Sequence, residues 1–192
     1  MKKKRPIRVT EVLDFVNSKW KEYWYRHVGF EKADRISKES REFGTKVHKI
    51  IEDHLNGCLQ IEDYSELELE VADLIIKWLE ENNVKTLHTE LELENPKLNL
   101  VGHADFIGEL GSEAVVIDWK TSKEHRTEFP LQKAAYAKMA NDKLGLKINK
   151  GITLRCDREN RVLDVKEYKK LVTTYWPQFL CCLKVFKIFN GK

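Results

Sequence analysis

Apolar residues recur at helical spacing through the first part of the chain. Thr10 is a suitable N-cap for a first helix, which carries Val12, Leu13, Phe15 and Val16. A second helical pattern covers residues 37–55 and stops before Gly57, a residue type that often follows a helix. A third covers residues 65–82, with an apolar stripe made of Leu67, Val71, Leu74, Ile75 and Leu79. The pattern predicts a mainly helical segment over residues 1–83.

The spacing changes from helical to alternating between residues 86 and 120, with turn signals at Asn95-Pro96 and Gly111-Ser112. This predicts three antiparallel strands. A helix over residues 129–143, a strand over 148–156 and a shorter strand over 162–165 follow. A last helix is predicted over residues 167–189, and Pro177 should kink it or start a new segment.

This order of elements predicts an α/β fold, in which a mixed central sheet is flanked by helices. Residues 84–165 would form the sheet with its crossover helix, and residues 166–192 a C-terminal helix. Because no repeat, low-complexity tract or linker divides the chain, we predict a single domain over residues 1–192.

Composition agrees with such a domain. The chain has 192 residues, of which 42% are hydrophobic and 34% charged. The net charge of +3 is too balanced to establish nucleic-acid binding by itself. The basic start, Met1-Lys2-Lys3-Lys4-Arg5, is not followed by an apolar run, and no later run approaches membrane length. We therefore expect a cytoplasmic protein that does not enter a membrane.

Two acids and a lysine stand out around the second turn. If Gly111-Ser112 is a two-residue hairpin turn, paired residues have numbers that sum to 223, which places Asp105 opposite Asp118. Side chains alternate along a strand, so Asp118 and Lys120 share one face while Trp119 points to the other. The three polar groups should therefore converge.

Paired carboxylates repel each other unless a cation lies between them, and their hard oxygens suit Mg²⁺ or Mn²⁺. Such an ion would polarise a phosphate and acidify a bound water, while Lys120 would orient that water. On these three residues alone, a solvent-facing amphipathic hairpin explains the pattern equally well.

Aromatic residues crowd the segment before the second helical pattern. Trp20, Tyr23, Trp24 and Tyr25 could stack on bases, although most aromatics in a helical pattern belong to a core. This sequence feature leaves both interpretations open.

Four short motifs in order carry a family resemblance. They are Gly44-Thr45-Lys46-Val47-His48, Gly102-His103-Ala104-Asp105, Asp118-Trp119-Lys120-Thr121 and Gln132-Lys133-Ala134-Ala135-Tyr136. Together they resemble the motifs of the RecB-like branch of PD-(D/E)XK nucleases, which includes phage-type and mitochondrial exonucleases and CRISPR adaptation nucleases. Any one motif is weak, but four in this order are specific.

The resemblance implies a role for each position. His48, Asp105 and Asp118 would be side-chain metal ligands, with the Trp119 carbonyl as another, and Asp105, Asp118 and Lys120 would carry the catalysis. Supporting or DNA-binding positions would be Thr121, Gln132 and Tyr136. Glu90, Glu92 and Glu94 alternate on one strand, and Glu90 is the one that the family pattern favours near the metal, although a solvated face explains at least two of them.

The expected function is that of a Mg²⁺- or Mn²⁺-dependent DNA nuclease, most simply an exonuclease acting on single strands or DNA ends in replication, recombination or repair. Its partners would be DNA and a recombination or replication protein. The alternative is a catalytically silent subunit of the same fold that binds DNA or serves in an assembly. Some relatives hold an iron–sulfur cluster with one cysteine before the first motif and three near the C-terminus. Cys58, Cys156, Cys181 and Cys182 do not follow that pattern, so we expect no cluster.

Overall fold

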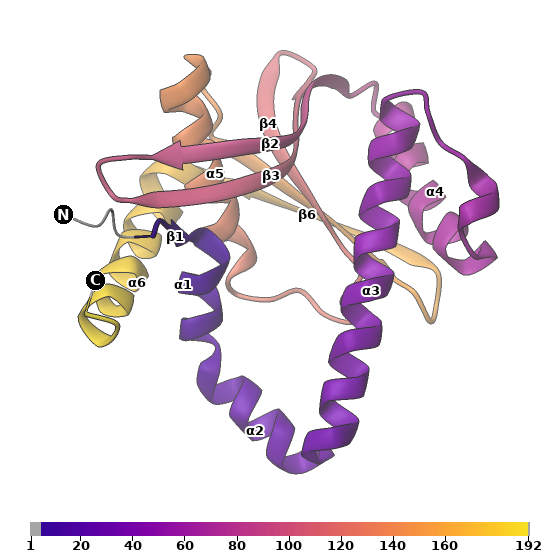
Figure 1. The fold of residues 1–192 in the computed structure, drawn as a ribbon. Coiled ribbons are helices and arrows are strands. Elements are labelled where there is room, and N and C mark those ends of the chain that lie inside the picture. Colours follow the sequence, from indigo (N-terminus) through magenta and orange to yellow (C-terminus); the bar gives the residue numbers. More distant parts are fainter. Residues whose placement is uncertain (1–4, 192) are drawn as a thin grey trace.

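A computed structural model of the protein describes residues 5–191 and is shown in Figure 1. The four residues of the basic start, 1–4, lie outside the described residues.

Four helices precede most of the sheet: α1 (Val9–Val16), α2 (Ser18–Val28), α3 (Phe30–Leu55) and α4 (Glu66–Glu81). The start of α4 matches the prediction, because Ser65 caps it and the Glu68 carboxylate accepts a hydrogen bond from the Ser65 backbone N–H at 2.8 Å. The predicted N-cap of α1, Thr10, was wrong by two residues, because Arg8 is the N-cap. The Glu11 carboxylate accepts a hydrogen bond from the Arg8 backbone N–H.

Helix α3 is longer than predicted, because it starts at Phe30 rather than near residue 37. Its first turns are rich in charged residues and bury little, so they lack the apolar stripe on which the prediction relied. Helix α2 was not delimited from the sequence, and although its aromatic residues recur at helical spacing, none of its residues is buried.

The sheet has six strands: β1 (Ile7–Arg8), β2 (Lys85–Asn95), β3 (Leu100–Leu110), β4 (Glu113–Lys120), β5 (Lys150–Asp157) and β6 (Val162–Lys169). The order is β1-β3-β4-β5-β6, and β2 also pairs with β3. The predicted antiparallel arrangement of β2, β3 and β4 is confirmed. Helix α5 (Phe129–Leu144) crosses over, so β5 runs parallel to β4.

The C-terminal part differs from the prediction. Strand β6 continues to Lys169, paired with Lys150 of β5, so a helix does not begin at residue 167. A π-helical turn, Leu171–Tyr175, leads into α6 (Trp176–Phe189). Pro177 lies in the first turn of α6, where its missing N–H costs nothing, and so it starts a new segment, one of the two predicted outcomes.

Helices cover both faces of the sheet, which confirms the predicted α/β fold with a mixed sheet flanked by helices (Figure 1). On one face α3 and α4 pack against Phe106, Ile117 and Trp119. On the other, α1, α5 and α6 pack against Ile107 and Val116. Among residues 5–191, no helix combines the length and the apolar character that a membrane crossing needs.

Candidate active site

The predicted hairpin register is confirmed as far as the pairing extends. Phe106 pairs with Ile117 and Gly108 with Val115, so the numbers sum to 223. Asp105 and Asp118 are the next residues beyond the Phe106–Ile117 pair. At Asp118 strand β4 pairs with Thr153 of β5. The two acids therefore lie at the point where β3 and β4 part.

Glu90 is the strand β2 glutamate that lies beside Asp105. Its neighbours pair with β3, Thr89 with Phe106 and Leu91 with Ala104, so Glu90 falls opposite Asp105. The backbone of Glu90 has φ 47°, in the left-handed region that few residues other than glycine adopt. Such a conformation next to a cluster of polar groups is typical of functional sites.

His103 holds Glu90 in place. Its Nδ1 atom lies 3.0 Å from Glu90 Oε2, and its Nε2 atom lies 2.6 Å from the Glu90 backbone oxygen. The same motif that supplies Asp105 thus also supports the neighbouring glutamate. The sequence contained His103 in that motif but no pattern that assigned it this contact.

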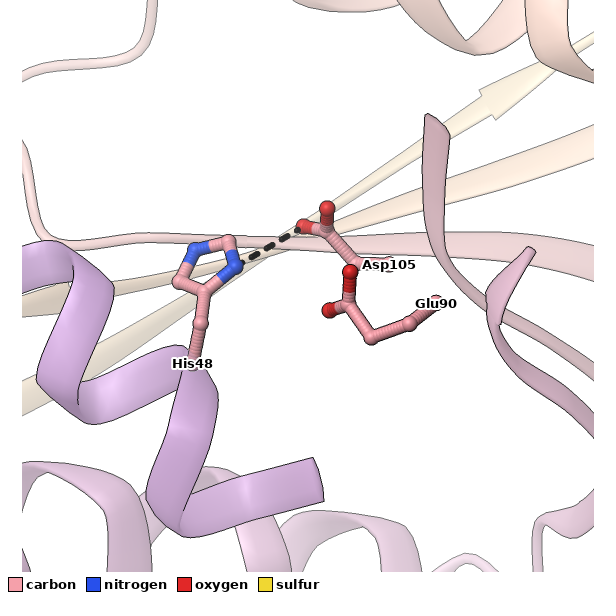
Figure 2. A group of neighbouring side chains, drawn as sticks. All are labelled: His48, Glu90 and Asp105. Atoms are coloured by element: carbon pink, nitrogen blue, oxygen red, sulfur yellow. Dashed lines mark ion pairs between the residues drawn. The ribbon is translucent and has the colours of Figure 1, made fainter. Parts of the chain in front are cut away.

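Helix α3 brings His48 to these acids. One ligand atom each of His48, Glu90 and Asp105 lies within 4.8 Å of the others, and Figure 2 shows the three side chains pointing toward a common centre. His48 Nδ1 is 3.7 Å from Asp105 Oδ2, and His48 Nε2 is 3.2 Å from the Trp119 carbonyl oxygen. Within the described chain, buried Asp105 Oδ2 has no hydrogen-bond partner. A nitrogen and two carboxylates, one of which has an unsatisfied buried oxygen, fit a divalent cation.

Asp118 has a different environment, because two lysines bind it. Lys120 Nζ lies 2.5 Å from Asp118 Oδ1, and Lys133 Nζ lies 3.2 Å from Oδ2. Asp118 is 1% exposed and the Lys133 side chain is fully buried. Asp118 is therefore not a member of the group formed by His48, Glu90 and Asp105, which we call the His48 group, although Asp118 lies next to this group.

Sequence reasoning missed Lys133, which follows Gln132 in the fourth motif. A signal was present: Phe129, Lys133, Ala137 and Ala140 recur at helical spacing, and the three others are apolar. A lysine within an apolar stripe must either leave the core or find a buried acid. Here it finds Asp118, and Lys133 Nζ also lies 5.5 Å from the centroids of the Phe129 and Tyr168 rings.

These contacts set the protonation of the site. Burial opposes ionisation of Asp118, but the charges of Lys120 and Lys133 outweigh it and lower its pKa to about 2. Burial lowers the pKa of Lys133 to about 8, against the attraction of Asp118. Burial also disfavours the charge of Lys120, yet Asp118 and Asp105 raise its pKa above the usual value. Asp118 is thus a carboxylate and Lys120 an ammonium at neutral pH.

The two acids of the His48 group have pKa values shifted the other way. Burial raises the pKa of Asp105, the His48 charge opposes this, and the Asp118 charge adds to it. Burial likewise raises the pKa of Glu90, with a contribution from Asp105. Carboxylates whose ionisation is this unfavourable are the ones that a bound cation would stabilise.

The fourth motif lies on α5 as predicted. Gln132 Nε2 donates a hydrogen bond to the Tyr136 hydroxyl at 3.1 Å, and Tyr136 is buried. Burial raises the pKa of Tyr136 to about 12, so its hydroxyl keeps its proton. Tyr136 also lines a cavity of about 700 Å³, together with Arg8, His103 and Lys143.

Two motif glycines permit close packing around the site. A Cβ at Gly44 would lie 3.3 Å from Thr121 Oγ1, so the absence of a side chain lets α3 approach the end of β4. A Cβ at Gly102 would lie 2.5 Å from Tyr136 Cε1. The glycines of the first two motifs are thus explained by contacts with residues of the third and fourth.

We expect Gly102→Ala to lower the free energy of unfolding by roughly 1–3 kcal/mol, because the new methyl group displaces the Tyr136 ring. Urea denaturation of the variant measures this cost. In a Tyr136→Ala background the same substitution should cost much less, since the shortest contact is gone and only the flexible end of Met139, 3.2 Å away, remains close. An equal cost in both backgrounds would contradict the contact as the cause.

Comparisons with known proteins identify the family of the chain. The family model of the PD-(D/E)XK nuclease superfamily matches residues 21–174. No curated protein sequence matches the chain. Among solved structures, that of SSO0001 is similar over 100% of this chain and 79% of its own, with a TM-score of 0.50 and 14% identity, a likeness of fold alone. The alkaline exonuclease LHK-Exo from Laribacter hongkongensis, solved with dAMP, gives a TM-score of 0.42 and 12% identity, over 97% of this chain and 93% of its own.

The family match spans all four motifs, and the structure brings His48 to Asp105 and Lys133 to Asp118 where β3 and β4 part. By this match the chain belongs to the PD-(D/E)XK nuclease superfamily.

Proposed function

We propose that this protein is a Mg²⁺- or Mn²⁺-dependent deoxyribonuclease that acts as an exonuclease on single strands or DNA ends, in replication, recombination or repair. One observation carries the proposal. His48 and Glu90 lie around Asp105, whose buried Oδ2 atom has no hydrogen-bond partner in the described chain, next to the Asp118–Lys120 pair.

The proposed metal ligands are His48, Glu90 and Asp105. The Trp119 carbonyl and Asp118 would complete the set, because a carboxylate offers about four lone-pair positions and the two lysines occupy only two. A bound cation would polarise the phosphate and lower the pKa of its water. The imidazole nitrogen makes Mn²⁺ a better match than Mg²⁺, which prefers oxygen ligands alone.

Side chains next to the proposed cation would orient the attacking water and hold the phosphate. Lys120 keeps its proton at neutral pH and can donate a hydrogen bond to the attacking water or to the charge that develops on the phosphate. Asp118 holds the Lys120 ammonium at 2.5 Å and so fixes its position. The Tyr136 hydroxyl keeps its proton and, supported by Gln132, can donate to a phosphate oxygen beside the cavity. Thr121 supports the end of β4 against α3.

Cleavage of end-labelled single- and double-stranded DNA tests the proposal. We expect products with Mn²⁺ or Mg²⁺, none with EDTA, and one-nucleotide steps if the enzyme is an exonuclease. Labels at the 5′ and 3′ ends would read the polarity. DNA binding with no cleavage on any substrate or metal would instead support a silent DNA-binding or assembly subunit.

Metal binding should also be visible without DNA. We expect Mn²⁺ to raise the melting temperature relative to EDTA, because it binds the native state and relieves the unfavourable charges of Glu90 and Asp105. At about 100 times its dissociation constant the ion would add about 2.7 kcal/mol of stability. Thermal melts of His48→Ala, which removes a proposed ligand, should show a much smaller metal response.

A further inference from the structure

Helix α2 carries a stripe of aromatic side chains of which three are exposed and one, Trp24, is half-buried. Trp20, Tyr23, Trp24 and His27 recur at the i, i+3, i+4 and i+7 spacing of one helix face. Such a stripe normally lies in a core, yet none of the residues of α2, all of which the structure describes, is buried. Trp20 is 55% exposed and Tyr23 61%. An exposed aromatic stripe of this size indicates an interaction surface.

The rings of this stripe lie in two neighbouring pairs, one nearly parallel and one tilted by 34°. The Trp20 and Trp24 ring planes differ by 6°, with centroids 6.3 Å apart. Tyr23 and His27 lie with ring centroids 3.8 Å apart. Exposed aromatic rings of this kind offer faces on which unpaired bases stack, because every base has a π-face.

The charge around the stripe suits a polyanion. Helix α2 contains three cations, Lys19, Lys21 and Arg26, against one acid, Glu22. Lys21 forms an ion pair with Asp14 of α1 and Arg26 forms one with Glu22, but both pairs are exposed and therefore weak, so a polyanion can compete for these cations. A fourth cation comes from outside the helix, because the Arg126 guanidinium lies 5.5 Å from the Trp20 ring centroid. Aromatic faces interleaved with cations are typical of surfaces for single-stranded nucleic acid rather than for an apolar partner.

The stripe is also continuous with the candidate active site. Arg126 lies in the segment that joins Lys120, at the end of β4, to Phe129, at the start of α5. The Phe129 ring centroid in turn lies 5.6 Å from Lys120 Nζ. A DNA strand in contact with Trp20 would thus be separated from the proposed catalytic residue Lys120 only by the short segment that contains Arg126.

We propose that the aromatic face of α2 (Trp20, Tyr23, Trp24 and His27) stacks the bases of the single-stranded DNA substrate and holds the strand whose phosphates reach the active site. This rests on the proposed function and narrows it to a substrate whose bases are unpaired, because bases within a duplex already stack on one another. The first step of recognition would be independent of base sequence.

The test is strand binding in EDTA, where no cleavage occurs. A labelled oligothymidylate of about 20 nucleotides, longer than a typical single-strand site, would be titrated with the wild type and with the double variant Trp20→Ala/Trp24→Ala. We expect the variant to bind at least roughly tenfold more weakly by fluorescence anisotropy. An abasic strand of equal length should be bound equally by both proteins, because it offers phosphates but no bases.

Phe189→Ala is the matched control, because Phe189 is an aromatic residue 74% exposed at the end of α6. It should bind the oligothymidylate as the wild type does. Tryptophan fluorescence gives a second readout: quenching by the strand should shrink in the double variant, in which Trp78, Trp119 and Trp176 remain. Circular dichroism would verify that each variant folds.

Two results would overturn the inference: equal affinity of the wild type and the folded double variant, or no binding of the strand by the wild type. Neither depends on catalysis. Failure of the proposed nuclease function would appear separately, as absence of metal-dependent cleavage by a wild type that still binds DNA through α2.

Discussion

Asp105→Asn is expected to abolish metal-dependent DNA cleavage while leaving the metal-free protein as stable as the wild type, or more stable. The activity loss should be on the order of a thousandfold or more, because a proposed ligand and its charge are removed together. The stability effect follows from the raised pKa of Asp105, since burial makes its ionised form unfavourable in the native state. At pH 7 the native carboxylate thus costs free energy that an asparagine does not.

The sign of this effect can be checked by pH. When the pKa of a carboxyl is raised in the native state, the protein loses stability as pH increases from the unfolded-state pKa, 3.8, through the native pKa. The wild type should therefore lose stability relative to Asp105→Asn across that window. Mn²⁺ should reverse the order of the melting temperatures, because only the wild type keeps the full ligand set.

Asp142→Asn is the matched control for this substitution. Asp142 lies on α5, away from the site, and forms a surface ion pair with Lys138. We expect it to cleave DNA and to respond to Mn²⁺ as the wild type does. Substantial cleavage by purified Asp105→Asn would sink the proposed role of Asp105.

The parts of the fold that could be predicted from sequence are those in which a local signal and burial agree. The Gly111-Ser112 turn determines the β3–β4 register, and Ser65 with Glu68 determines where α4 starts. Strand β1 could not be predicted, because its two residues carry no alternation and owe their conformation to pairing with Leu100 and Val101 of β3. Long-range pairing of this kind has no local sequence signal.

The candidate site shows the same division. The hairpin register placed Asp105, Asp118 and Lys120 near one another, and the family resemblance added His48. The sequence did not reveal that Glu90 adopts φ 47° opposite Asp105, because no local pattern requires the left-handed region at a glutamate within a strand. Nor did it reveal that Lys133 crosses from α5 to Asp118, since a contact between a helix and a strand depends on packing.

Lys133 also changes how tests of Asp118 should be interpreted. Its fully buried ammonium is bound by Asp118, so Asp118→Ala removes the acid that offsets this charge. Breaking a buried ion pair by removing one partner costs several kcal/mol, roughly 3–5 in measured cases. Loss of cleavage in Asp118→Ala would therefore combine lost catalysis with lost stability. Lys120→Gln, which leaves the Lys133–Asp118 pair in place, separates the two.

Replacing Lys133 by methionine should remove a specific pH dependence of stability. Burial lowers the native pKa of Lys133 to about 8, from the ordinary value of 10.5. Between these values the unfolded chain holds a proton that the native protein has released, so native stability rises with pH. The stability of the wild type minus that of Lys133→Met should thus increase by about 3 kcal/mol across this window. Asp118 and Lys120 titrate outside it, because the pKa of the first is about 2 and that of the second is raised above 10.5. Urea denaturation at a series of pH values measures this difference in the free energy of unfolding. Lys138→Met, on the same helix, is the control. Parallel curves of stability against pH for the wild type and Lys133→Met would show that the native state does not suppress the Lys133 charge.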